Sequence, residues 1–206
     1  MSSLEEDKRL NSIQYLLHSA AVCRALGGRR IIFHSGSCGK QSREAALEKA
    51  LDTMRRAVAA LDEAGFGDMT LCPETMGKVG QLGTLDEVLA LCGVDSRITP
   101  CIDFGHLNAR TLGGIRSKAD YAAILDRIGE LLAERGLAPV IICESAGTQA
   151  EDAKTMKRFF EACLCTTSQS GLRPPAPLAG EPLAYTKSFH RLPRPLLLGN
   201  NNDGEV

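Results

Sequence analysis

Apolar positions recur at two different spacings along the chain, and the two kinds of segment alternate. Helical spacing predicts helices over residues 10–26, 43–64, 118–134 and about 150–163. Short runs rich in β-branched and apolar residues predict strands at Arg30–Phe33, Asp68–Cys72, Ile98–Ile102 and Pro139–Cys143. Thr84 can cap one more helix that begins with Asp86 and Glu87, because acidic side chains suit a helix N-terminus.

Strands that alternate with amphipathic helices indicate right-handed βαβ units and a parallel sheet. About four such units lie within residues 1–164, too few to close an eight-stranded barrel. Residues 165–206 hold most of the nine prolines and show no sustained periodicity. We therefore expect an incomplete (β/α)8 barrel of the α/β class over 1–164, followed by a disordered Pro-rich tail over 165–206.

Composition limits the cellular compartments and the binding partners that we expect for the protein. Of the 206 residues 44% are hydrophobic, but no apolar run approaches the roughly 18 residues of a membrane span. The polar N-terminus lacks the apolar core of a secretory signal, so we expect a cytoplasmic protein without a membrane partner. The net charge of −1 gives no global attraction to nucleic acid. Eight scattered cysteines without a CxxC pair favour buried thiols over disulfides.

Each predicted strand is followed by a side chain that can bind a metal. These side chains are His34, Glu74, Asp103 with His106, and Glu144. In parallel α/β folds such positions meet at one edge of the sheet, where the carboxylates would repel one another without a cation. Imidazole mixed with carboxylate suits Zn²⁺, Mn²⁺ or Fe²⁺, and bridging carboxylates are typical of two-metal phosphoester chemistry. The same ligands could also hold a metal for sugar isomerisation.

Four stretches carry a family resemblance. They are FHSGSCGKQSREAALEKAL, LCPETMGKVGQLGTLDEVLALC, ITPCIDFGHLNARTLGG and PVIICESAGTQAEDAKTMKRF. Over roughly residues 5 to 163, in family order, the chain resembles endonuclease IV, a metal-dependent apurinic/apyrimidinic endonuclease of the xylose isomerase-like TIM barrel superfamily. The resemblance implies a trinuclear zinc site that cleaves double-stranded DNA on the 5′ side of an abasic nucleotide.

The resemblance also implies a role for each candidate residue. His34 resembles a ligand of the first zinc, and Glu74 resembles the glutamate that bridges the first and second zinc ions. Asp103 resembles a ligand of the second zinc, and His106 a ligand of the third. Glu144 resembles the last-strand glutamate of the second zinc, and it is the candidate catalytic residue that orients the attacking water.

Other parts of the family pattern are missing. About three βα units that precede residue 10 in the family have no counterpart, nor does a histidine-bearing unit between the Asp103/His106 segment and Glu144. His190 lies in the tail without matching context. By family count the first zinc keeps two of three ligands, the second three of four and the third one of three. We therefore expect two zinc ions, with Mn²⁺ as an alternative.

Two other functions stay open at the level of sequence. A sugar isomerase or epimerase could use the same barrel, although the absence of Trp offers little aromatic stacking for a sugar. A non-catalytic fragment, altered by internal deletion and a foreign tail, would explain the missing ligands. The sequence does not reveal the oligomeric state.

Overall fold

The computed structural model describes residues 1–137, 140, 142, 147 and 150–158. Residues 1–116 form one compact unit, and a second unit begins at Ser117. The predicted strand at 139–143, Glu144 and the predicted tail at 165–206 lie wholly or mostly outside the described residues. Residues 150–158 are helical, as the sequence predicts for that segment.

The described helices follow the predicted pattern closely, with one addition. They are α1 (Glu6–Ala25), α2 (Arg43–Glu63), α3 (Leu85–Cys92), α4 (Phe104–Arg110) and, in the second unit, α5 (Lys118–Glu134). The helix predicted at 10–26 begins four residues earlier than expected, whereas those predicted at 43–64 and 118–134 match to within one residue. The sequence pattern does not predict helix α4, which follows directly after the strand end at Asp103.

Local hydrogen bonds fix where the helices begin. Ser42 caps α2 by accepting a hydrogen bond from the backbone N–H of Ala45, at 3.2 Å. Thr84 caps α3 as predicted, and it forms a reciprocal capping box with Glu87. Gly65 follows the end of α2 with a φ of +76°, a backbone conformation that glycine adopts without strain. Caps of this kind contribute about 1 kcal/mol each, so these boundaries are encoded locally.

Three parallel strand segments lie side by side in the first unit. The strands β1 (Arg30–Phe33) and β2 (Thr70–Pro73) pair in parallel, with Phe33 opposite Pro73. A third segment continues the sheet beyond β2 through parallel bridges from Leu71 to Ile98 and from Glu74 to Cys101. The strand predicted at Asp68–Cys72 thus begins and ends later, and the one predicted at Ile98–Ile102 is reduced to two bridges. The order of the segments follows the order of the chain, as in βαβ units.

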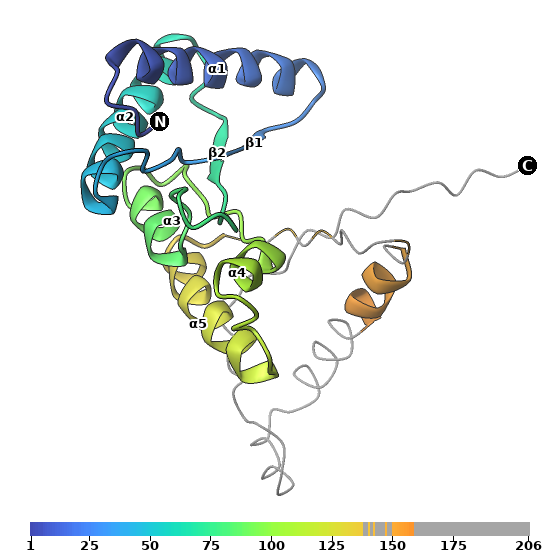
Figure 1. Cartoon of the computed structure of the whole chain (residues 1–206). Coiled ribbons are helices and arrows are strands. Elements are labelled where there is room, and N and C mark those ends of the chain that lie inside the picture. Colours follow the sequence, from blue (N-terminus) through green and yellow to red (C-terminus); the bar gives the residue numbers. More distant parts are fainter. Residues whose placement is uncertain (138–139, 141, 143–146, 148–149, 159–206) are drawn as a thin grey trace, which may run out of the picture. The chain divides into compact units, whose positions relative to one another are not determined.

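The core of the first unit lies between the sheet and its helices. Helix α1 packs against α2 and β1, while α3 packs against α2 and β2 (Figure 1). Met54 on α2, Leu91 on α3 and Ile98 are fully buried, together with Leu71 of β2. The fold is therefore mixed α/β and consistent with the predicted incomplete barrel.

Two expectations from composition bear on the described part of the chain. Within it, no helix is long and apolar enough to cross a membrane. Its five cysteines are free thiols, of which Cys72 and Cys92 are buried and the others partly exposed. Burial raises the pKa of the Cys72 thiol, which keeps this sulfur protonated and unreactive.

Candidate metal centre

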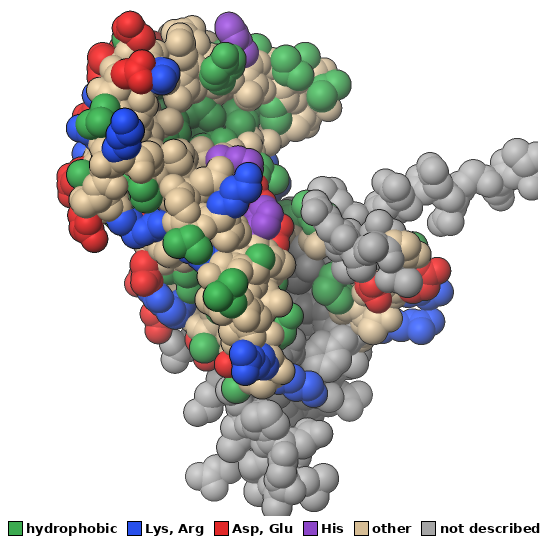
Figure 2. Space-filling view, viewed as in Figure 1, with side chains coloured by type: hydrophobic (Ala, Val, Ile, Leu, Met, Phe, Trp, Pro, Cys, Tyr) green, Lys and Arg blue, Asp and Glu red, His purple; other side chains and the backbone are tan. Residues whose placement is uncertain are grey.

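The predicted residues lie at one edge of the sheet. His34 directly follows β1, Glu74 directly follows β2, and Asp103 follows the third segment. The backbone N–H of Glu74 donates to the carbonyl oxygen of Phe33 at 3.0 Å, and the N–H of Thr75 donates to Cys101 at the same distance. These bonds hold the three strand ends next to one another. Figure 2 shows histidine side chains at the surface beside acidic and basic ones.

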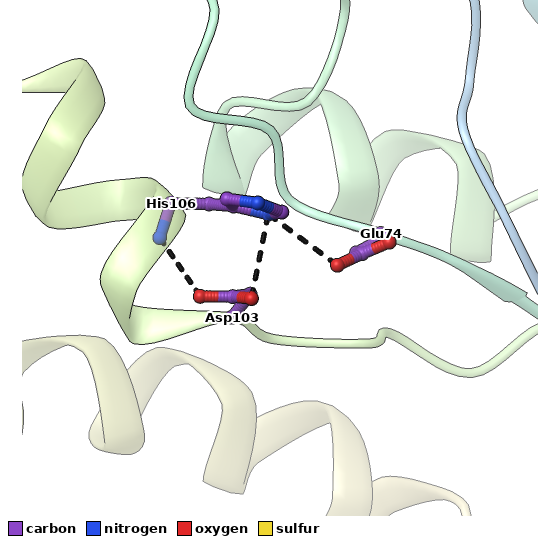
Figure 3. A group of neighbouring side chains, drawn as sticks. All are labelled: Glu74, Asp103 and His106. Carbon is purple, nitrogen blue, oxygen red and sulfur yellow. Dashed lines mark hydrogen bonds and ion pairs between the residues drawn. The ribbon is translucent and has the colours of Figure 1, made fainter. Parts of the chain in front are cut away.

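Three of the five candidates form one compact cluster. Glu74, Asp103 and His106 each offer a ligand atom, and these atoms lie within 4.8 Å of one another. Nδ1 of His106 is 3.3 Å from Oε1 of Glu74 and 3.5 Å from Oδ2 of Asp103 (Figure 3). The three side chains are 16%, 31% and 39% exposed for Glu74, Asp103 and His106, so solvent and a small ion can reach them.

His34 lies near the second carboxylate oxygen of Glu74. Its Nε2 is 3.5 Å from Oε2 of Glu74, and its side chain is 58% exposed. The two carboxylate oxygens of Glu74 therefore face two different imidazoles, that of His106 and that of His34. A carboxylate in this position can bridge two cations, which is the role that the family resemblance implies for Glu74.

Helix α4 positions Asp103 and His106 relative to each other. Oδ1 of Asp103 accepts a hydrogen bond from the backbone N–H of His106 at 2.8 Å, which caps the helix and places His106 in its first turn. Oδ2 of Asp103 remains on the side of the imidazole. Because the chain turns into this short helix directly after Asp103, His106 lies close to the strand end although it is three residues further along the chain. An Asp with apolar Leu107 four residues later was the local signal for it.

Thr75 supports the cluster through two hydrogen bonds, and no pattern in the sequence points to this residue. It is fully buried, and its hydroxyl accepts a hydrogen bond from the backbone N–H of Asp103 at 2.9 Å. Its carbonyl oxygen is 2.9 Å from Nδ1 of His106. In a neutral imidazole this contact places the proton on Nδ1, the nitrogen that faces the two carboxylates, and leaves the lone pair on Nε2 free.

The donor set fits a divalent transition metal. Within the described residues, no Lys or Arg forms an ion pair with Glu74 or Asp103, so the two neighbouring carboxylates lack a permanent countercharge. Two carboxylates and one imidazole are three protein donors, the number that catalytic zinc sites use together with water. Glu144, the fifth predicted ligand and the candidate catalytic residue, lies outside the described residues.

Comparison with known proteins assigns the chain to a family. Residues 1–149 match the xylose isomerase-like TIM barrel family. The chain is also similar to an uncharacterized protein of Methanocaldococcus jannaschii, with 33% identity over 137 residues, which are 66% of this chain and 49% of that relative. It thus spans about half the length of this curated relative. The parallel strand order, the donor residues at the strand ends and this match agree: the chain belongs to the xylose isomerase-like TIM barrel family.

Proposed function

We propose that this chain carries the metal centre of a DNA repair endonuclease that hydrolyses the phosphodiester backbone 5′ to abasic sites, as in endonuclease IV. The observation that supports the proposal is the position of Glu74, whose two oxygens face His106 and His34. A bridging carboxylate between two cation positions suits phosphoester hydrolysis, in which both the attacking and the leaving oxygen carry charge. The family includes both DNA repair endonucleases and sugar isomerases, so family membership leaves the substrate open, and abasic DNA is our proposal for it.

Each residue of the site has a proposed role in binding a cation or in supporting a ligand. Glu74, Asp103 and His106 would hold one Zn²⁺ or Mn²⁺ ion, and His34 with the second oxygen of Glu74 would contribute to another. Bound cations of this kind lower the pKa of water and offset the charge that develops on a phosphate. Thr75 keeps the His106 ring in one orientation, and Asp103 keeps α4 attached to the strand end. Glu144 remains the proposed residue that orients the attacking water.

Metal binding is the first test of the proposal. The purified full chain, freed of metal with a chelator, is titrated with Co²⁺ as a visible probe of zinc sites, and bound zinc is counted by mass spectrometry. We expect Glu74→Gln and His106→Gln to weaken binding at least about tenfold, since each removes one of three protein donors. His18→Gln is the matched control, because this exposed histidine lies on α1. A wild-type chain without bound zinc or Co²⁺ contradicts the proposal and supports the fragment hypothesis.

Incision of DNA is the second test. The zinc- or manganese-loaded chain is incubated with a duplex that carries one abasic analogue, and with the same duplex without it. We expect a single cut 5′ to the analogue, lost in Glu74→Gln and retained in His18→Gln. Binding of metal without incision overturns the endonuclease assignment for this chain. Metal-dependent turnover of a ketose by the same preparation would replace it with the sugar isomerase alternative.

A further inference from the structure

Two arginine side chains fill the loop that follows Glu74 and Thr75. The loop, residues 76–82, closes on itself because the backbone N–H of Met76 donates to the carbonyl oxygen of Gly83 at 2.9 Å. Arg110 of α4 donates hydrogen bonds to four of its carbonyl oxygens. The acceptors are Met76 at 3.0 Å, Lys78 at 3.0 Å, Val79 at 3.3 Å and Gln81 at 3.2 Å.

Arg43 of α2 reaches the same loop from another helix. It donates to the carbonyl oxygens of Val79 and Gln81, and it also forms a 2.7 Å ion pair with Glu87. Arg110 forms no ion pair within the described part of the chain. Burial, followed by the nearby charge of Arg43, lowers the pKa of the Arg110 guanidinium, although the group stays protonated at neutral pH. The dipoles of the backbone carbonyl groups therefore compensate most of the positive charge of Arg110.

Arg110 connects this loop to the metal cluster through α4. It follows His106 by four residues, so the two side chains lie on the same side of the helix. The loop backbone also touches α4 at this point: a Cβ atom on Gly77 would lie 3.5 Å from the carbonyl oxygen of His106. Since the loop begins two residues after Glu74, a shift of α4 against the loop would change the distance between His106 and Glu74.

We propose that Arg110 is a positioning residue for the metal cluster. By binding four carbonyl oxygens of loop 76–82 it fixes α4 against the end of β2, and it thereby keeps the Nδ1 of His106 on the carbonyl oxygen of Thr75. The consequence for metal affinity rests on the proposed function. The effect on the His106 ring does not, because it concerns contacts that are present without an ion.

Arg43 provides a matched comparison for Arg110. Both guanidinium groups bind Val79 and Gln81, so loss of either one loosens the same loop. Only Arg110 belongs to the helix that carries His106. A merely structural role predicts that Arg43→Met and Arg110→Met act alike on the cluster. A positioning role predicts that only Arg110→Met alters it.

The first experiment uses the metal-free full chain. Long-range ¹H–¹⁵N NMR spectra at pH 8 report which ring nitrogen of each histidine carries the proton, with His106→Gln supplying the assignment. We expect the Nδ1–H tautomer for His106 in the wild type and in Arg43→Met, and a shift towards the other tautomer in Arg110→Met. Arg110→Lys, which keeps the charge but cannot span four carbonyls, serves if the Met variant does not fold. An unchanged His106 signal in a folded Arg110 variant overturns the proposal.

The second experiment measures Co²⁺ binding and its visible spectrum. Replacing groups that orient metal ligands costs about 10–100-fold in metal affinity, so we expect a loss of this size and an altered spectrum in Arg110→Met. Arg43→Met should retain the wild-type spectrum and an affinity within about threefold. Equal losses in both variants contradict positioning and assign both arginines to loop stability. If the wild type binds no Co²⁺, the proposed function fails, and the NMR result still decides the role of Arg110.

Discussion

The carboxylate of Glu87 offers a quantitative test of how the loop beside the metal cluster is held. Glu87 is only 5% exposed, and three hydrogen-bond donors surround it. Arg43 donates to it at 2.7 Å, and the backbone N–H groups of Gly83 and Thr84 donate at 2.7 and 2.9 Å. In Glu87→Gln the new NH₂ group must face at least one of these donors, and Arg43 loses its countercharge.

The expected cost follows from these contacts. Breaking a buried ion pair by removing one partner costs about 3–5 kcal/mol, because the other charge stays buried. The Arg43 side chain is 32% exposed, and water recovers part of that loss. We therefore expect Glu87→Gln to lower the free energy of unfolding by about 2–3 kcal/mol, the upper part of the range for a hydrogen bond to a charged group.

Urea unfolding of the full chain, followed by far-UV circular dichroism at pH 7, measures this cost. With a slope of about 2 kcal/mol per molar urea, the midpoint should fall by about 1–1.5 M at constant slope. Glu63→Gln is the control, since this residue is exposed near the end of α2. In an Arg43→Met background the cost of Glu87→Gln should shrink by at least about 1 kcal/mol. A midpoint within 0.25 M of wild type for Glu87→Gln, roughly 0.5 kcal/mol at that slope, would refute the reasoning.

Three further predictions concern the same unit. Gly83→Ala should lower the free energy of unfolding by at least about 2 kcal/mol, because φ is +139° and the new Cβ would lie 2.6 Å from the backbone nitrogen of Met76. Gly80→Ala is the control, since its Cβ would meet nothing within 4 Å. Equal urea midpoints for the two variants would contradict this prediction. Leu112→Gly should raise stability by about 0.5–1 kcal/mol, because Leu112 is 90% exposed and has a φ of +54°; a lower thermal midpoint would count against it. Burial raises the pKa of Glu87, but the hydrogen bonds from Arg43 and the two backbone N–H groups outweigh it, so the folded pKa lies below the ordinary 4.5. The carboxylate therefore stabilises the fold above pH 4.5, and this contribution disappears as the pH falls through the folded pKa. Glu87→Gln should show a shallower loss of stability on acidification than wild type, and parallel curves would disprove the assignment.

The sequence by itself determined the elements that depend on neighbours along the chain. Apolar spacing and the cap at Thr84 are local, and they predict α2 and the start of α3 almost to the residue. The alternation of strands and helices implied a parallel sheet. A parallel sheet places the residues after each strand at one edge, so the sequence alone groups His34, Glu74 and Asp103.

Tertiary structure alone decided how these residues face one another. The sequence does not predict helix α4, because seven residues are too few to show helical periodicity. This helix nevertheless turns His106 back towards Glu74. The contact of each Glu74 oxygen with a different imidazole depends on side-chain directions that spacing does not encode. The carbonyl oxygens that bind Arg110 belong to the backbone, which every residue shares. Such contacts have no signature in the sequence, because any residue type supplies a carbonyl oxygen. The folded path of the loop backbone is what brings these oxygens together around Arg110.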